Sequence, residues 1–130
     1  MIKNQEKPEE LIQAEKLIDD AKVNEAHELL NNFERKEGLT LHDKVSSHLL
    51  RADLLFQQGR YKEVVMLAEE TYDMSLGLGK NLQSVDYLIL RAESLRYLGK
   101  PNKSLDVIIQ GEQLLKNLTQ VLSSTRMKRE

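Results

Sequence analysis

Residues 50–61 read LRADLLFQQGRY and residues 90–101 read LRAESLRYLGKP, so one phrase occurs twice in this chain. Five identical residues recur at a shift of 40 positions (99 − 59): Leu50, Arg51, Ala52, Leu55 and Gly59 return as Leu90, Arg91, Ala92, Leu95 and Gly99. A degenerate copy, IQAEKLIDDAKV, covers residues 12–23 at a shift of 38 (59 − 21), with Ala14, Leu17 and Ala21 at the matching places. A fixed period in this range is typical of helical hairpins stacked into a solenoid.

The composition favours an all-helical protein. Charged residues make up 31% of the 130 positions, aromatic residues make up 5%, and tryptophan is absent, which suits helices better than a β-sandwich. The formal net charge of −2 offers no general attraction to nucleic acid or to an anionic membrane. Because there is no cysteine, disulfides, thiolate metal sites and a cysteine nucleophile are excluded.

The apolar residues indicate where the helices lie. They recur at helical spacing and predict three hairpins over about residues 8–37, 41–76 and 81–122. Gly38 is a suitable helix C-cap, and Thr40 to Asp43 offers N-cap residues for the next helix. We therefore predict one domain over residues 1–122, followed by a polar tail over residues 123–130.

The repeated residues resemble those of tetratricopeptide repeat (TPR) proteins over roughly residues 8–120. The matching positions are Ala14, Leu17, Ala21, Val23 and Ala26 in the first repeat, Ala52, Leu55, Gly59, Tyr61 and Ala68 in the second, and Ala92, Leu95, Gly99, Pro101 and Gly111 in the third. The resemblance implies an all-α, right-handed superhelical solenoid of three helix–turn–helix hairpins, with six helices. Repeats of 38 and 40 residues exceed the usual 34 and are similar to the longer repeats of kinesin light chain and related scaffolds.

In TPR arrays the first helix of each hairpin lines a concave groove, and the resemblance implies four sets of groove positions here. The sets are Leu11, Leu49 and Ile89; Glu15, Asp53 and Glu93; Ile18, Phe56 and Arg96; and Asp19, Gln57 and Tyr97. An aliphatic stripe should therefore run beside an acidic stripe.

The acidic stripe separates this chain from one well-known use of the fold. Carboxylate-clamp TPR domains have Lys, Arg and Asn at these places, whereas Glu15, Asp53 and Glu93 would repel a C-terminal carboxylate. We expect a protein partner that binds through a peptide or a helix with Lys or Arg beside apolar side chains. The alternative is that the acids are only solvated and the aliphatic stripe belongs to the core.

The last predicted helix is apolar on more than one side, since it carries nine Leu, Ile and Val residues between positions 105 and 122. A homodimer through this helix is one expectation, and packing against a downstream domain is another. The plain alternative is that the helix only covers the third hairpin.

Catalysis is poorly supported by the sequence. His42 and His48 are six residues apart, which is not the i, i+4 spacing of two metal ligands on one helix face. Gly77-Leu78-Gly79-Lys80 lacks the Lys-Ser/Thr ending of a phosphate-binding loop, because Asn81 follows Lys80. We expect no catalytic residue, no cofactor and no metal site.

The expected function is a non-enzymatic protein–protein interaction module, an adaptor or scaffold, with no nucleic-acid or membrane partner. Two alternatives remain: a regulatory TPR fragment of a larger signalling protein or enzyme, and a structural homo-oligomer assembled through terminal apolar faces. The N-terminus lacks the apolar region of a signal peptide, and no apolar run reaches transmembrane length. The expected location is therefore cytoplasmic.

Overall fold

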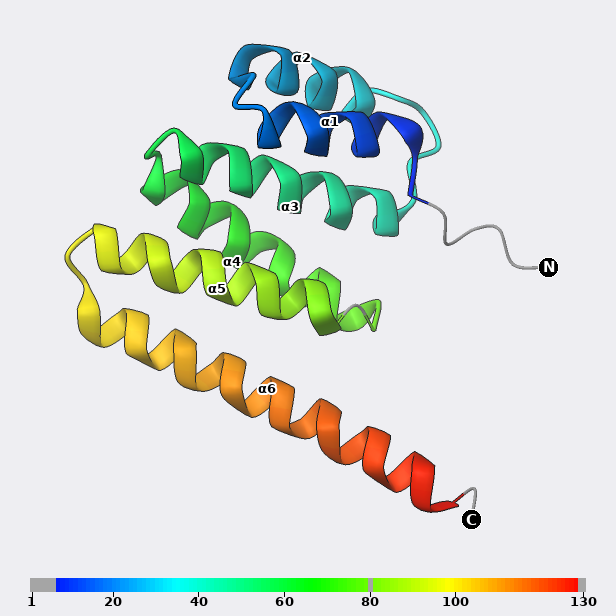
Figure 1. The fold of residues 1–130 in the computed structure, drawn as a ribbon, viewed down its shortest axis with the longest axis vertical. Coiled ribbons are helices and arrows are strands. Elements are labelled where there is room, and N and C mark those ends of the chain that lie inside the picture. Colours follow the sequence, from blue (N-terminus) through cyan, green and yellow to red (C-terminus); the bar gives the residue numbers. More distant parts are fainter. Residues whose placement is uncertain (1–6, 80, 129–130) are drawn as a thin grey trace.

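A computed structural model describes residues 7–79 and 81–128 (Figure 1). Within these ranges the chain forms six α-helices and no strand, which confirms the predicted all-α class. The helices are α1 (Glu9–Asp19), α2 (Val23–Glu34), α3 (Leu41–Gln57), α4 (Tyr61–Gly77), α5 (Asn81–Tyr97) and α6 (Pro101–Lys128). Residues 1–6 of the predicted domain and residues 129–130 of the predicted tail lie outside the described ranges.

The turns that join α1 to α2, α3 to α4 and α5 to α6 are built in the same way. In each, two backbone N–H groups close the preceding helix in the 5→2 and 6→1 pattern of a Schellman motif. The donor–acceptor pairs, 2.8–3.0 Å apart, are Ala21–Ile18 and Lys22–Leu17, Gly59–Phe56 and Arg60–Leu55, and Gly99–Arg96 and Lys100–Leu95. The residue at the first donor position has φ of 60° in Ala21, 73° in Gly59 and 75° in Gly99.

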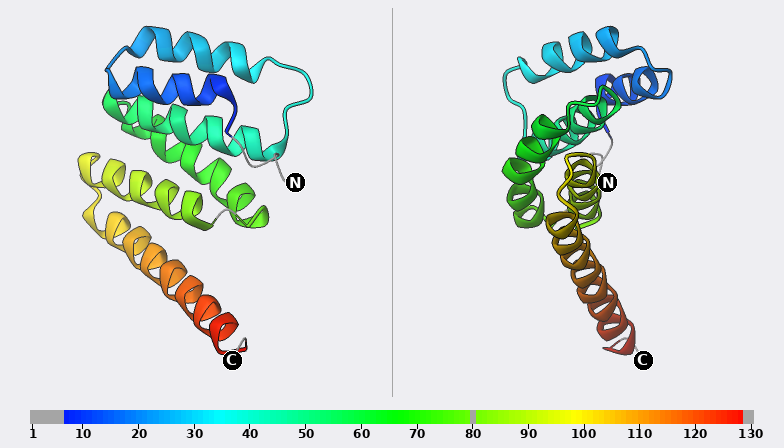
Figure 2. Two further views of the ribbon diagram at one scale, coloured as in Figure 1. Left: turned by 45° about the vertical axis from the view of Figure 1, so that its right-hand side comes forward. Right: turned by 90° about the vertical axis from the view of Figure 1, so that its left-hand side faces the viewer.

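The helices pack in a regular order along the chain (Figures 1 and 2). Each helix contacts the next one, and in addition α1 contacts α3 and α3 contacts α5. In the described part of the chain α2 does not pack against α4, nor α4 against α6. The helices α1, α3 and α5 therefore form one continuous layer, which we call the inner layer.

The core follows the repeated residues. Ala14, Ala52 and Ala92 are all buried, as expected where two helices approach closely. Leu30 and Leu54 are fully buried with Leu11 in one apolar cluster that joins α1, α2 and α3. Each such leucine stabilises the fold by roughly 1.5–3 kcal/mol.

The start of α3 confirms the predicted N-cap. The Asp43 backbone N–H donates to the Thr40 hydroxyl at 3.1 Å, and the Thr40 N–H donates to the Asp43 carboxylate at 3.3 Å. This reciprocal pair is a capping box, and a cap of this kind contributes about 1 kcal/mol.

The last helix is longer than the sequence predicts. We expected a polar tail from residue 123, but α6 continues to Lys128. Residues 123–128 contain neither proline nor glycine, and extending a helix that already exists needs only one new hydrogen bond per added residue. The C-terminal part of α6 extends beyond the body of the other helices (Figures 1 and 2).

Candidate functional site

An open groove crosses the inner layer and has a volume of about 490 Å³. We call it the acidic groove, because carboxylates from all three inner helices line it. Its residues are Lys7, Glu15, Asp19, Leu49, Leu50, Asp53, Gln83, Asp86, Ile89 and Leu90.

Five of the predicted groove residues meet in this groove. Glu15 and Asp19 come from α1, Leu49 and Asp53 from α3, and Ile89 from α5. The spacing of 38 and 40 residues brings equivalent helix faces side by side, so an acidic and an apolar stripe share one groove.

The carboxylates of the groove act on one another. Partial burial raises the pKa of Asp53 above its usual value, and the negative charges of Asp19 and Glu15 raise it further. Burial also raises the pKa of Asp86. Negative charge is therefore concentrated where water solvates it incompletely, and a cation placed there would relieve the repulsion.

The chain supplies one cation to this groove itself. The Lys7 ammonium forms an ion pair with the Glu15 carboxylate, and Lys7 lies in the segment just before α1. The arrangement shows that a lysine side chain can reach the acidic stripe from outside the inner helices.

Leu11 is not available for binding, contrary to the sequence prediction. Its exposed fraction is 0%, and it belongs to the apolar cluster that contains Leu50 and Leu54 of α3. The equivalent residues Leu49 and Ile89 face the groove, but at Leu11 the neighbouring helices close over the side chain.

Three further predicted residues lie at the end of the inner layer near the turns, outside the groove lining. Phe56 and Tyr97 meet edge to face at 5.9 Å between ring centroids, and the Tyr97 ring stacks on Tyr61 at 4.8 Å. The Arg96 guanidinium lies 5.0 Å from the centroid of the Tyr97 ring. Tyr61, which starts α4, was missed as a member of this aromatic cluster.

The remaining predicted residues are not part of the groove either. Ile18 is buried in the core, Gln57 is exposed and Glu93 is half-buried. Gln83 and Asp86 line the groove but were missed, because neither occupies a position shared by all three repeats. The i, i+3 spacing of Asp86 and Ile89 on α5 was the available signal.

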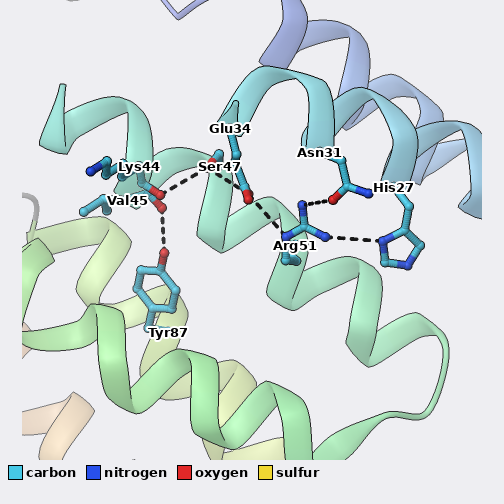
Figure 3. A network of polar contacts seen from close by, with 8 residues as sticks. All are labelled: His27, Asn31, Glu34, Lys44, Val45, Ser47, Arg51 and Tyr87. Carbon is cyan, nitrogen blue, oxygen red and sulfur yellow. Dashed lines mark hydrogen bonds and ion pairs between the residues drawn. The ribbon is translucent and has the colours of Figure 1, made fainter. Parts of the chain in front are cut away.

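A polar network between α2 and α3 was also missed (Figure 3). The Arg51 guanidinium of α3 donates to Glu34 at 3.2 Å and to Asn31 at 2.8 Å, both on α2. The ring of His27 lies 3.5 Å from Arg51 and 2.8 Å from the side chain of Gln58. His27 is therefore not a free surface histidine, and the network joins α2 to α3.

The repeated Arg91 makes the equivalent contact one hairpin later. Its guanidinium pairs with Glu69 of α4 at 3.3 Å, as Arg51 pairs with α2. The arginine of the repeated LRA phrase thus holds each inner helix to the hairpin before it, and its recurrence in the sequence could have revealed this.

Within residues 7–79 and 81–128, no three His, Asp or Glu side chains are grouped so that they could hold a metal ion. No helix in these ranges has both the length and the apolar content required to cross a bilayer. Comparison of the chain with protein-family models, curated proteins and solved structures found no match.

Proposed function

We propose that the six helices form a TPR-like, right-handed superhelical solenoid of three hairpins. The proposal is supported by the three turns with the same hydrogen bonds at residues 21, 59 and 99. It is also supported by the contacts of α1 with α3 and of α3 with α5, which stacked hairpins require.

We propose further that the chain is a non-enzymatic adaptor or scaffold of the cytoplasm that binds a protein partner in the acidic groove. One observation carries the proposal: four carboxylates from three helices surround an apolar strip made by Leu49 and Ile89. A peptide or helix with Lys or Arg beside apolar side chains fits both features. The same charge disfavours the phosphates of nucleic acid and of anionic lipids.

The direct test is fluorescence anisotropy with a labelled amphipathic helical peptide that has Lys on its polar face and Leu on its apolar face. We expect saturable binding that weakens with added salt. The double variant Glu15→Gln/Asp53→Asn should weaken it about tenfold, since two close charge contacts are lost.

Two controls separate a groove from general charge attraction. Asp73→Asn removes one exposed carboxylate on α4, outside the groove, and should leave the affinity unchanged. A peptide with Glu in place of Lys should not bind. The proposal fails if this acidic peptide binds as tightly as the basic one, or if Asp73→Asn weakens binding as much as the groove variant does.

Lys7 provides a second test, because it pairs with Glu15 where we place the cation of the partner. Lys7→Ala frees that carboxylate and should tighten binding of the basic peptide. Weaker binding by Lys7→Ala would show that Lys7 is part of the recognition surface and not a competitor.

A further inference from the structure

A second pocket lies on the outer face of the last hairpin, between α5 and α6, and has a volume of about 170 Å³. We call it the terminal pocket. Its lining is almost wholly apolar and includes Val85, Ile89, Ile108, Gly111 and Glu112. Ile108 and Leu115 on its wall are 45% and 43% exposed.

The middle hairpin contains the same pocket in an occupied form. The turns at Gly59 and Gly99 have matching hydrogen bonds, so a shift of 40 relates the two hairpins. In the middle hairpin, the residues equivalent to Val85, Ile89, Ile108, Gly111 and Glu112 of the terminal pocket are Val45, Leu49, Ala68, Thr71 and Tyr72.

These five residues surround a single side chain, Tyr87 of α5. Val45 and Ala68 share its apolar cluster, Leu49 and Tyr72 pack against that cluster, and the Thr71 side chain lies beside the phenol. The Tyr87 hydroxyl donates to the Val45 carbonyl oxygen at 2.6 Å (Figure 3). Tyr87 is 0% exposed, so its side chain is enclosed by these neighbours and out of contact with solvent.

Residue size at this place supports the comparison. In the first hairpin, Phe33 is equivalent to Thr71 (71 − 38). The helix that packs on this hairpin is α3, and its residue equivalent to Tyr87 is the small Ser47 (87 − 40). In the middle hairpin the smaller Thr71 faces the large Tyr87. In the last hairpin, the residue equivalent to Thr71 is Gly111 (71 + 40), the smallest residue. A helix that packs on this hairpin should therefore carry a large side chain at the position equivalent to Tyr87.

We propose that the terminal pocket binds an aromatic anchor, a Tyr or Phe, carried by an amphipathic helix of a partner protein. This helix lies across α5 and α6 as α5 lies across α3 and α4, and a Tyr anchor places its hydroxyl at the carbonyl oxygen of Val85 (45 + 40). The terminal pocket shares Ile89 with the acidic groove, but its other lining residues differ and the inference does not depend on the proposed groove function.

A second copy of this chain fits the pocket poorly. If α1 of another copy stacked on the last hairpin, the residue at the position of Tyr87 would be Glu9 (87 − 40 − 38). Glu9 is a carboxylate in the first turn of α1, and burying it in an apolar pocket without a partner is strongly unfavourable. We therefore assign the pocket to a different protein.

Two adjacent residues at the rim of the pocket, Ile108 inside it and Ile109 outside it, allow a matched pair of variants. Ile109 occupies the position of Glu69 (69 + 40), and Glu69 pairs with Arg91, four residues after Tyr87. Ile108 occupies the position of Ala68, inside the pocket. Ile108→Glu and Ile109→Glu make the same change at adjacent residues that are 45% and 54% exposed.

The experiment uses the full chain and a labelled peptide with the sequence of residues 81–97, which contains Tyr87 and Arg91 as the internal template. We expect saturable binding by fluorescence anisotropy and a loss of about tenfold or more with Ile108→Glu, as for a central anchor site. Ile109→Glu should leave affinity unchanged or raise it, because it recreates the partner of Arg91. In the peptide, Tyr87→Ala should remove binding and Tyr87→Phe should preserve most of it.

Four results overturn the proposal: no binding of the unaltered peptide, equal loss in the two isoleucine variants, equal binding of the Tyr87→Ala peptide, or self-association that occupies the site. The last would appear in sedimentation equilibrium as a dimer of the chain alone that Ile108→Glu abolishes. Circular dichroism of both variants verifies that they remain folded, which we expect because both side chains are exposed.

Discussion

The first and last hairpins have the same turn but opposite outer surfaces. Among the described residues of α1 and α2, Ile12 is the one large apolar side chain that is exposed. The last hairpin exposes many: Leu82, Ile89, Tyr97, Leu105, Ile108, Ile109, Leu115 and Val121. The backbone plan is therefore repeated while the side chains differ, so that one end is a polar cap and the other a surface suited to a partner.

The largest expected effect comes from emptying the pocket of the middle hairpin, between α3 and α4, that Tyr87 of α5 occupies. Tyr87→Ala removes a fully buried ring and should lower the free energy of unfolding by about 3–5 kcal/mol. Tyr87→Phe keeps the ring, removes the hydroxyl that donates to Val45, and should lower the free energy of unfolding by about 0.5–1.5 kcal/mol. Urea unfolding measures both. A loss for Tyr87→Ala no larger than that for the exposed Tyr97→Ala would contradict the buried role of Tyr87.

The next prediction concerns the equivalent residues Ala52, which neighbouring helices cover, and Ala92, which borders the terminal pocket. Ala52→Leu overpacks a site covered by neighbouring helices and should lower stability by about 1–3 kcal/mol. Ala92 borders the terminal pocket, so Ala92→Leu has room and should lower stability by less than Ala52→Leu. Thermal unfolding of the two variants decides the matter, and equal losses would show that the terminal pocket is not open.

Substitutions in the turns should change the free energy of unfolding by a smaller amount, with opposite signs at Gly99 and Ala21. Gly99→Ala places a side chain at φ of 75° and should lower stability by about 1 kcal/mol. Ala21 already has φ of 60°, so Ala21→Gly should raise stability by about 0.5 kcal/mol after the entropy of the unfolded glycine is counted. Gly111→Ala is the control for helix propensity, because its new methyl group would meet Leu88 at 3.8 Å, an ordinary contact. The turn assignment is wrong if Ala21→Gly destabilises the protein.

The smallest effect is a pH dependence in the groove. The pKa of Asp53 is raised in the folded protein, so the folded state holds the proton more tightly than the unfolded state. Stability linked to this group is therefore highest below pH 3.8, the ordinary value, and falls as the pH rises through the raised folded pKa.

The Asp53→Asn variant cannot ionise at this position, so it should not lose stability as the pH rises. At neutral pH it should be more stable than the unaltered protein by about 0.2–1 kcal/mol, the range of partly exposed charge interactions. The two proteins should converge in urea unfolding below pH 3.8, where Asp53 is neutral in both states. A constant difference at all pH values would mean that the carboxylate charge is not responsible.

The helices and turns could be predicted because they depend on local residues. Thr40, Gly59 and Gly99 mark helix ends by conformational and capping preferences that act within a few positions. Gly38 is not the predicted C-cap, because α2 already ends at Glu34 with Arg35 as its C-cap. The length of α6 was missed because the polar residues at its end lack an apolar stripe, and helix continuation does not require one.

The site was predicted only where its residues repeat. Glu15, Leu49, Asp53 and Ile89 share positions and meet in the groove, whereas Asp86 belongs to one helix alone. Leu11 occupies a shared position but is buried, because burial depends on how α3 crosses α1. Such crossings are set by packing over the whole chain and leave no mark at a single position.

We propose that a basic amphipathic peptide binds in the acidic groove and not at the apolar end. Methyl NMR of the full chain with the Lys- and Leu-bearing peptide distinguishes these two surfaces. We predict shift changes at Leu49 and Leu50 of the groove, and none at Ile109 and Val121 of α6. Shift changes confined to α6, with no change at Leu49 and Leu50, would show that the peptide binds at the apolar end and not in the groove.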